Sequence, residues 1–440
     1  MAIRRDTICA LASGLPPSAI SVIRISGPAT TSIIQSRLSV SPLKPRHASL
    51  VDLRSRSGSV IDSGLAIYMP GPASYTGEDT LEISLHGGRM ITELALESIM
   101  SAGARLAEPG EFTRRAFEAG KLDLTRAEAV ADLIDAESEA QLSQALKQMD
   151  GALEDLYSGW RADLTEMLAL LEASIDFPDE EDAPDRVDAP VLEKLNTLRS
   201  DLIDALADGN ITERIRDGFK VAILGKPNAG KSTLLNQLAK REAAIVTDIP
   251  GTTRDVVEVR LVLGGYLVWI SDTAGLRETV DVVEAEGVRR ALKVADEADL
   301  RLWIHDAREP IESDRVQPGD LVVSNKSDLA DPESVSRETL SISAKTGFGI
   351  DLIEAAIVER LGALTKNVGA PIITRARHRQ GLERALTQLE AAIDHLKAGI
   401  GSEFVSEDVR LASRELGTLT GHVDPESVLG AVFSSFCIGK

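Results

Sequence analysis

The spacing of apolar and polar positions divides the chain into regions, and the first region reads as strands. From Ile20 to Leu85, short apolar runs such as SVIRISG, SGLAIYMP and TLEISLHGG alternate with clusters of Gly, Pro and Ser. This spacing is typical of β-strands joined by turns. The next stretch, MITELALESIMSAGA, has apolar residues three and four positions apart, which indicates a helix. We therefore predict an α+β domain over residues 1–118.

The second region has a helical period. From about Leu122 to Ile175, apolar residues recur at three- and four-residue spacing with no internal proline, which predicts long amphipathic helices. The same pattern returns near the end of the sequence in RARHRQGLERALTQLEAAIDHLKAGI and EDVRLASRELGTL. Because an insertion at a surface point disturbs a domain little, we expect one helical domain, residues 119–216 and 363–440, interrupted by another.

The interrupting stretch, residues 217–362, alternates strand-like and helical segments. Its β-rich runs are FKVAILG, EVRLVLGGYLVWISD, LRLWIHDA, DLVVSNKSD and ETLSISAK. Alternation of this kind predicts a parallel α/β sheet with crossover helices. The expected fold class is therefore multidomain, with an α+β domain, a discontinuous helical domain and an inserted P-loop α/β domain.

Composition and charge restrict the function classes. No apolar stretch is long enough to span a membrane and the apolar run at the N-terminus is too short for a secretory signal, so we expect a cytoplasmic protein. Only two cysteines are present, Cys9 and Cys437, which argues against a disulfide framework. The formal charge of −21 opposes non-specific binding to a phosphate backbone, so a nucleic-acid role requires a local basic patch or a partner.

One motif predicts phosphate binding. The segment GKPNAGKS, residues 225–232, fits G-x-x-x-x-G-K-[ST] and lies between the apolar run KVAIL and the helical run TLLNQLAK. Gly225 and Gly230 allow successive backbone N–H groups to turn toward the phosphates. Lys231 is expected to reach the β and γ phosphates, and the Ser232 hydroxyl to bind Mg²⁺.

Three further motifs follow in the order that GTPases use. They are GTTRD at residues 251–255, DTAG at 272–275 and NKSD at 325–328, with SAK at 343–345 expected beside the base. Asp272 can hold the magnesium shell, and the Gly275 amide can meet the γ phosphate. The Asp328 carboxylate can accept hydrogen bonds from the guanine ring N–H and exocyclic amine, which adenine does not offer in that arrangement. The nucleotide is therefore predicted to be GTP.

The position after DTAG departs from Ras-like proteins. It is Leu276, where Ras-like GTPases carry the glutamine that orients the attacking water. Two residues are candidates for organising hydrolysis in another way. Asn228 could help to bind a monovalent cation, and Glu284 could orient the water. Spacing alone favours the alternative that Glu284 is an ordinary exposed residue of a helix.

Taken over its full length, the chain resembles the MnmE (TrmE) family of tRNA-modification GTPases. Besides the GTPase motifs, the resemblance rests on YTGEDTLEISLHGG, PGEFTRRAF, KLDLTRAEAVADLI and the terminal FCIGK. It implies a potassium-activated GTPase that forms a homodimer and a heterotetramer with the FAD-dependent protein MnmG. Together these add an aminomethyl or carboxymethylaminomethyl group to C5 of the wobble uridine of certain tRNAs, using 5,10-methylene- or 5-formyl-tetrahydrofolate.

The resemblance also assigns residues. Ser232 and Thr253 match the Mg²⁺ ligands, and Glu284 matches the water-orienting acid. The K⁺ ligands it implies are Asn228, Thr247, Ile249 and Thr252. The folate contacts it implies are Arg24, Glu82, Lys121 and Lys440. With the motifs, the GTP-contacting set becomes Asn228, Ala229, Gly230, Lys231, Ser232, Thr233, Thr247, Asp248, Ile249, Pro250, Gly251, Thr252, Thr253, Asp272, Thr273, Ala274, Gly275, Asn325, Lys326, Asp328, Ser343, Ala344 and Lys345.

Two questions stay open at this point. The family motif implies that Cys437 lies near folate, where it either takes part in chemistry as a thiolate or is a small apolar residue that fixes the tail. The function also has alternatives. One is a regulatory or ribosome-assembly GTPase that binds RNA without modifying it, although no GxxG clamp or basic tail is present. Another is a folate-binding module that uses GTP only to switch its partner.

Overall fold

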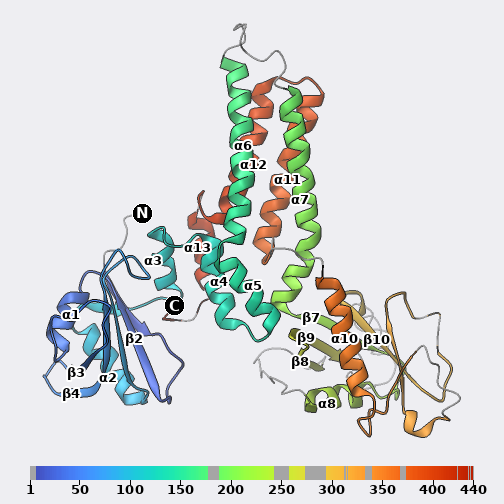
Figure 1. Ribbon diagram of the computed structural model, residues 1–440, viewed down its shortest axis with the longest axis horizontal. Helices are drawn as coiled ribbons and strands as arrows, with labels where there is room; N and C mark the ends of the chain where they lie inside the picture. Colours follow the sequence, from blue (N-terminus) through green and yellow to red (C-terminus); the bar gives the residue numbers. More distant parts are fainter. Residues whose placement is uncertain are drawn as a thin grey trace, which may run out of the picture. The chain divides into compact units, whose positions relative to one another are not determined.

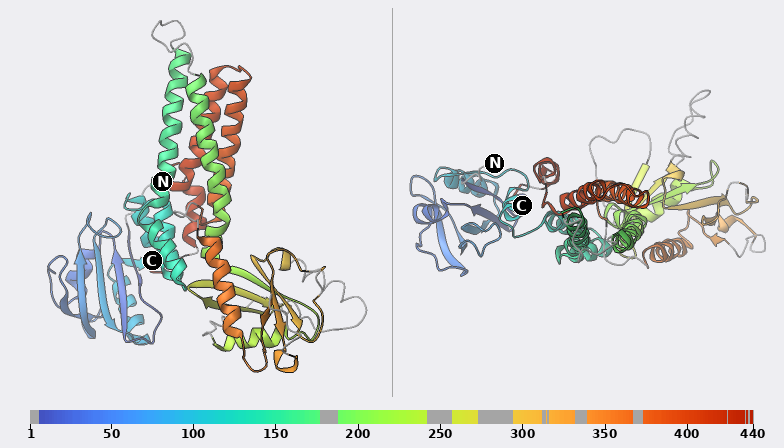
Figure 2. Two further views of the ribbon diagram at one scale, coloured as in Figure 1. Left: turned by 45° about the vertical axis from the view of Figure 1, so that its right-hand side comes forward. Right: turned by 90° about the horizontal axis from the view of Figure 1, so that it is seen from above.

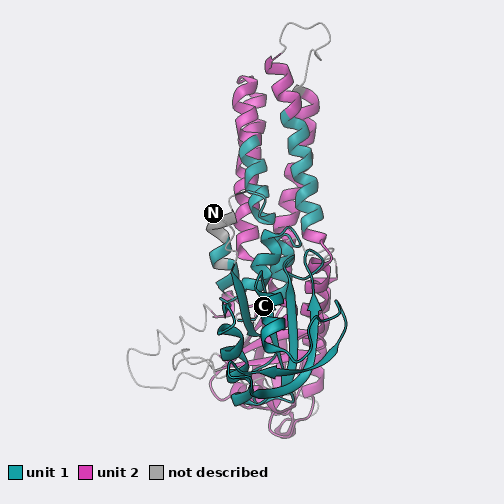
Figure 3. Cartoon of the chain, turned by 90° about the vertical axis from the view of Figure 1, so that its left-hand side faces the viewer, with its two compact units in different colours: residues 1–131, 154–168, 410–440 teal, residues 132–153, 169–409 magenta. Residues whose placement is uncertain are grey.

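The computed structural model describes residues 6–176, 188–241, 257–272, 294–311, 314, 316–331, 339–366, 373–423, 425–434, 436 and 438–439. The chain divides into two compact units, which are coloured separately in Figure 3. One unit comprises residues 1–131, 154–168 and 410–440, and the other residues 132–153 and 169–409. The predicted domain limits at residues 118, 216 and 362 stay predictions.

The N-terminal region is built on a six-stranded sheet (Figure 1). A helix follows each of its two central strands, β2 and β5, in the sequence. The strand order is β3-β4-β5-β2-β1-β6. The strands are β1 (Thr7–Leu11), β2 (Ile20–Ser26), β3 (Ser49–Arg54), β4 (Val60–Met69), β5 (Thr80–His86) and β6 (Ala104–Leu106). The helices are α1 (Thr30–Arg37), α2 (Arg89–Met100) and α3 (Glu111–Glu118). The predicted α+β class is confirmed.

One face of this sheet is apolar because alternate strand residues point to it. Ile23 and Ile25 of β2 and Leu81 and Ile83 of β5 are all fully buried. They form one cluster with residues of α1 and α2, among them Ile33 of α1. This cluster is the core that fixes the sheet register, in which Arg24 of β2 lies opposite Glu82 of β5 on the other face.

The helical region before the insertion is segmented more finely than its apolar period suggested. The stretch predicted to form long helices contains α4 (Leu124–Asp135), α5 (Glu139–Met149) and α6 (Ala152–Asp176). Ser138 begins α5 as a capping box: its hydroxyl accepts from the Gln141 backbone N–H, and the Gln141 side chain accepts from the Ser138 N–H. The predicted amphipathic helices are confirmed, and α6 is a long one, but the stretch also contains two shorter helices, the second of which begins at the Ser138 cap.

Two helices far apart in sequence lie side by side in Figures 1 and 2. They are α7 (Asp188–Asp217) and α11 (Ala376–Lys397), which precede and follow the inserted region. Ion pairs join them: Arg379 contacts Glu213 at 2.9 Å, and Arg199 contacts Glu390 at 3.1 Å. The remaining C-terminal helices are α12 (Ser402–Thr420) and α13 (Pro425–Ser434). The two helices that flank the insertion, α7 and α11, therefore pack together.

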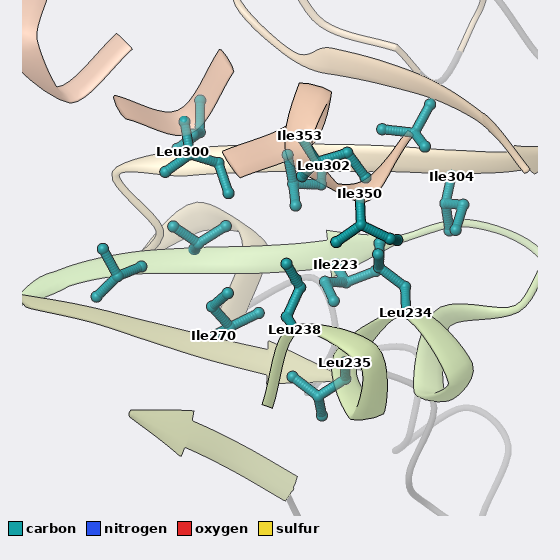
Figure 4. Close-up of a cluster of buried hydrophobic side chains, with 14 of the residues drawn as sticks. Ile223, Leu234, Leu235, Leu238, Ile270, Leu300, Leu302, Ile304, Ile350 and Ile353 are labelled. Carbon is teal, nitrogen blue, oxygen red and sulfur yellow. The ribbon is translucent and has the colours of Figure 1, made fainter. Parts of the chain in front are cut away.

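The inserted region contains the second sheet, in the order β12-β11-β10-β7-β9-β8. The strands are β7 (Phe219–Leu224), β8 (Val257–Leu263), β9 (Tyr266–Asp272), β10 (Leu300–Asp306), β11 (Leu321–Asn325) and β12 (Leu340–Ser341). Its helices are α8 (Lys231–Arg241), the short 3-10 helix η1 (Ser327–Leu329) and α10 (Ile350–Thr365). One apolar cluster joins the central strands to both α8 and α10 (Figure 4). The labelled members of the cluster are Ile223, Leu234, Leu235, Leu238, Ile270, Leu300, Leu302, Ile304, Ile350 and Ile353.

One expectation about this sheet was wrong. It is not wholly parallel, because β8 runs antiparallel to β9. The run EVRLVLGGYLVWISD reverses direction at Gly264 and Gly265, whose φ angles of 53° and 83° suit a two-residue hairpin turn. The other neighbouring strands pair in parallel, as predicted. Among the described residues, no helix is both long enough and apolar enough to cross a membrane.

Candidate nucleotide and folate sites

The loop between β7 and α8 has the geometry of a phosphate cradle. Gly225 has φ 142° and Gly230 has φ 100°, in the region that favours glycine. A Cβ at Gly225 would strike the Ile304 carbonyl oxygen, and one at Gly230 would strike the Asn325 side chain. The loop ends at Lys231, where α8 begins, and the first backbone N–H groups of a helix, which lack partners within the helix, can bind an anion. Glycine is thus required at both positions, because neighbouring atoms leave no room for a Cβ.

Lys231 is buried at the base of this loop, with 5% of its surface exposed. Its ammonium group donates to the carbonyl oxygens of Gly225 and Lys226, both at 2.8 Å. Burial lowers the pKa of Lys231, and the nearby Asp272 carboxylate opposes that change. The side chain is therefore held inside the loop by acceptors that a phosphate oxygen can replace.

Two oxygen ligands suitable for Mg²⁺ meet beside the loop. Ser232 is the second residue of α8, and its Oγ donates to Asp272 Oδ2 at 2.5 Å. Asp272 is the last residue of β9 and is 2% exposed. A hydroxyl and a carboxylate from neighbouring elements are the donor set that Mg²⁺ takes at such sites. These described residues therefore fit the metal that the motifs predict.

Asn325 brings three motifs together. It ends β11, is 2% exposed, and donates from Nδ2 to the Ala229 carbonyl oxygen at 2.7 Å. Its Oδ1 accepts from the backbone N–H of Ala344 at 2.9 Å. The P-loop, the NKSD segment and the SAK segment are thus joined by one buried amide. Ser343 and Ala344 are each 1% exposed.

The remaining described candidates of the nucleotide site are exposed to solvent. Asn228 is exposed and has φ 64°, and Thr233 and Lys345 are also exposed. Asp328, the expected guanine reader, is exposed in η1. The other predicted nucleotide, metal and hydrolysis residues lie outside the described residues: Thr247, Asp248, Ile249, Pro250, Gly251, Thr252, Thr253, Thr273, Ala274, Gly275 and Glu284.

A separate group of side chains surrounds Arg24 in the N-terminal region. Arg24 Nε pairs with Glu82 Oε1 at 2.8 Å, as their opposite register allows. The guanidinium carbon lies 5.6 Å from the ring centres of both Tyr75 and Phe112. Burial raises the pKa of Tyr75, which stays protonated and shares a 2.9 Å hydrogen bond with Thr113. The group thus combines two rings, a cation and a carboxylate.

The C-terminal tail reaches this group. Ile438 forms a β-bridge with Pro109, and the Gly439 carbonyl oxygen accepts from Arg24 Nη1 at 3.5 Å. Lys121 is exposed after α3, and its side chain lies near Gly77 in the segment that follows Tyr75. Cys437 and Lys440, the remaining predicted tail residues, lie outside the described residues. Arg24 and Glu82 are thus brought together beside the tail.

Sequence reasoning did not single out Tyr75 or Phe112. Both lie in motifs that carried the family resemblance, YTGEDT and PGEFTRRAF. No local spacing relates either ring to Arg24, because their proximity arises only when the loop and α3 fold against β2.

Two family models match the chain in succession. "GTP-binding protein TrmE N-terminus" matches residues 7–121, and "MnmE helical domain" matches residues 124–437. The chain belongs to the MnmE family of tRNA modification GTPases. The expected N-terminal, helical and P-loop regions are therefore those of this family.

Curated relatives in this family match from end to end. A protein described as "tRNA modification GTPase MnmE" from Hyphomonas neptunium is 56% identical over 438 residues, covering 99% of both chains. Proteins of the same description from Maricaulis maris and Caulobacter vibrioides are 49% and 48% identical. The match covers 99% of this chain in each case, and 99% and 100% of the respective relative.

Among solved structures, the G domain of the T. maritima FeoB iron transporter matches 32% of this chain and 98% of its own. The TM-score is 0.26 at 23% identity, so the family assignment rests on the family models and the full-length relatives.

Proposed function

We propose that this protein hydrolyses GTP to drive modification of tRNA. Acting with MnmG, it adds an aminomethyl or carboxymethylaminomethyl group to C5 of the wobble uridine. Full-length similarity to proteins described as tRNA modification GTPases supports the reaction class. The observation that carries the GTPase part is Asn325, which joins the phosphate loop to the NKSD and SAK segments.

The chain's own groups account for binding of the nucleotide. Lys231 exchanges its two carbonyl acceptors for phosphate oxygens, and the first turn of α8 supplies backbone N–H donors. Asp328 accepts from the guanine N–H groups and rejects adenine, which presents no matching pair of donors. Ser343, Ala344 and Lys345 lie on the segment that closes over the base.

Two metal ions belong to the proposed site. Ser232 and Thr253 would hold Mg²⁺, with Asp272 hydrogen-bonded to Ser232, and Asn228, Thr247, Ile249 and Thr252 would hold K⁺. When bound, the cations supply positive charge that stabilises phosphoryl transfer. Glu284 is proposed to accept a hydrogen bond from the attacking water and so to orient it.

The one-carbon donor is proposed to bind around Arg24. The rings of Tyr75 and Phe112 suit a planar heterocycle, and the Arg24–Glu82 pair offers both a donor and an acceptor. Lys121 and Lys440 would hold the carboxylates of the donor, which is 5,10-methylene- or 5-formyl-tetrahydrofolate. Cys437 is proposed to lie near this donor, because it belongs to the terminal FCIGK motif of the family.

The partners follow from charge and family. The protein is proposed to form a homodimer and a heterotetramer with MnmG. Because the net charge is −21, MnmG is expected to provide much of the affinity for tRNA.

A reconstituted reaction tests this function. Undermodified tRNA is incubated with the protein, MnmG, a tetrahydrofolate donor and either GTP or a non-hydrolysable analogue, and the wobble uridine is identified by mass. The modified base is expected only with GTP, and Asp328→Asn is expected to prevent its formation at limiting GTP. Equal modification with the analogue would contradict a role for hydrolysis, whereas RNA binding without any modified base would favour an RNA-binding regulatory GTPase.

A further inference from the structure

Asp306 is a buried carboxylate at the nucleotide site that the proposed function does not use. It is the last residue of β10, which lies between β7 and β11 in the sheet, and 7% of its surface is exposed. Lys326 Nζ donates to its Oδ2 at 2.9 Å. Arg308 donates from Nε at 2.9 Å, from Nη2 at 2.7 Å and from its backbone N–H at 3.1 Å. These donors hold the pKa of Asp306 well below its usual range, so the group is a carboxylate at neutral pH.

The backbone of Lys326 has an unusual conformation. Its φ angle is 63°, in the left-handed region, and it precedes the first residue of η1. For a residue with a Cβ this conformation is unfavourable, and it persists where surrounding contacts enforce it. Three contacts fix the chain at this point. The first is the ion pair of the Lys326 side chain with Asp306. The others are backbone hydrogen bonds of its two neighbours: the Ser327 N–H donates to the Ile342 carbonyl at 3.0 Å, and the Asn325 carbonyl accepts from the Ala307 N–H at 2.7 Å.

The conformation of Lys326 matters because the guanine reader follows directly. Asn325 is fixed by its own buried bonds, and Asp328 is exposed three positions later. The chain between them turns at Lys326. Of the contacts at this turn, the one with Asp306 is made by the Lys326 side chain itself and can be removed without altering the backbone.

We propose that Asp306 is a positioning residue for guanine recognition, which holds Lys326 so that the turn presents Asp328 to the base. This inference rests on the proposed reading of guanine by Asp328. The competing explanation is that Asp306 only stabilises the end of β10 through Arg308. Arg308 provides the control, because its side chain donates to the same carboxylate from the exposed side of the pair and is itself 51% exposed.

A double-mutant cycle on the full-length protein separates the two explanations. Affinity for fluorescent GDP is measured for the wild type, Asp306→Asn, Lys326→Ala and the combined variant, with Arg308→Ala beside them. Asp306→Asn is expected to weaken binding roughly tenfold, within the range of coupled contact pairs. The combined variant is expected to bind no more weakly than Lys326→Ala alone, and Arg308→Ala to stay within about twofold of wild type.

Three results would overturn the inference. They are unchanged affinity in Asp306→Asn, losses that multiply in the combined variant, or a loss in Arg308→Ala equal to that in Asp306→Asn. Should Asp306→Asn fail to fold, Asp306→Glu keeps the charge but moves it by one methylene, and the same non-additivity with Lys326→Ala is required. Failure of the proposed function would look different, since the wild type itself would then not prefer GDP to ADP.

Discussion

Replacing Asn325 by aspartate changes one NH₂ group to oxygen at the point where three nucleotide motifs meet. The acceptor for the Ala344 N–H is kept, at 2.9 Å. On the other side, an oxygen replaces the donor that lies 2.7 Å from the Ala229 carbonyl oxygen. The shape of the side chain is unchanged, so the effect isolates this one hydrogen bond.

The cost follows from burial. Asn325 is 2% exposed, so water cannot replace the lost donor. A buried acceptor left without its donor costs about 1–3 kcal/mol, and the repulsion between two close oxygens adds to this. We expect the inserted region to lose about 2–4 kcal/mol of stability, which lowers its unfolding temperature by roughly 5–10 °C. Burial raises the pKa of the new carboxyl, and its protonated form can donate to Ala229, so the defect should shrink as pH falls toward 5.

The assay is thermal unfolding of the full chain with and without GDP, together with GDP affinity. Asn196→Asp is the matched control, because its Nδ2 also donates to a backbone carbonyl, that of Leu192 at 2.7 Å, but on an exposed face of α7. The control should change stability by no more than about 0.5 kcal/mol. Equal behaviour of the two variants, or a defect in Asn325→Asp that does not depend on pH, would show that the Asn325–Ala229 hydrogen bond does not stabilise the inserted region as proposed.

Three further predictions concern single groups. Gly225→Ala should weaken nucleotide binding at least about tenfold, because its methyl group strikes the Ile304 carbonyl oxygen, whereas Gly159→Ala, with open space around its Cβ in α6, should fold and bind normally. Arg24→Ala should weaken binding of a tetrahydrofolate in isothermal titration, and Arg54→Ala on the same sheet should not; equal losses would count against the Arg24 site. Burial raises the pKa of Cys9 to about 11, so at pH 8 this thiol stays protonated. At most one thiol per native chain should then react with Ellman's reagent, against two after unfolding.

Features encoded in short segments could be predicted from the sequence. The P-loop was recognisable because its glycines, lysine and serine lie within eight positions between a strand and a helix. The helical regions were visible from their period. The capping box at Ser138 and Gln141 also had a local signal, S-x-x-Q, which marks the start of α5 within the predicted helical stretch.

Features that depend on contacts between distant segments could not be predicted. The reversal at Gly264 and Gly265 was hidden because the apolar run continues on both sides of it, and a buried strand and a hairpin share that pattern. The bridge from Asn325 to Ala229 and Ala344 joins residues that are 96 and 19 positions away. The partners of Arg24 likewise come from separate elements, so no spacing rule could have found them.

We propose that this GTPase hydrolyses GTP with the help of a potassium site that includes Asn228. The most direct test is the rate of GTP hydrolysis by the purified protein in KCl and in NaCl at equal ionic strength and saturating Mg²⁺, for the wild type and for Asn228→Ala. We expect strong stimulation by K⁺ over Na⁺ in the wild type and loss of this stimulation in Asn228→Ala. Equal rates in the two salts, or K⁺ stimulation that survives in Asn228→Ala, would contradict it.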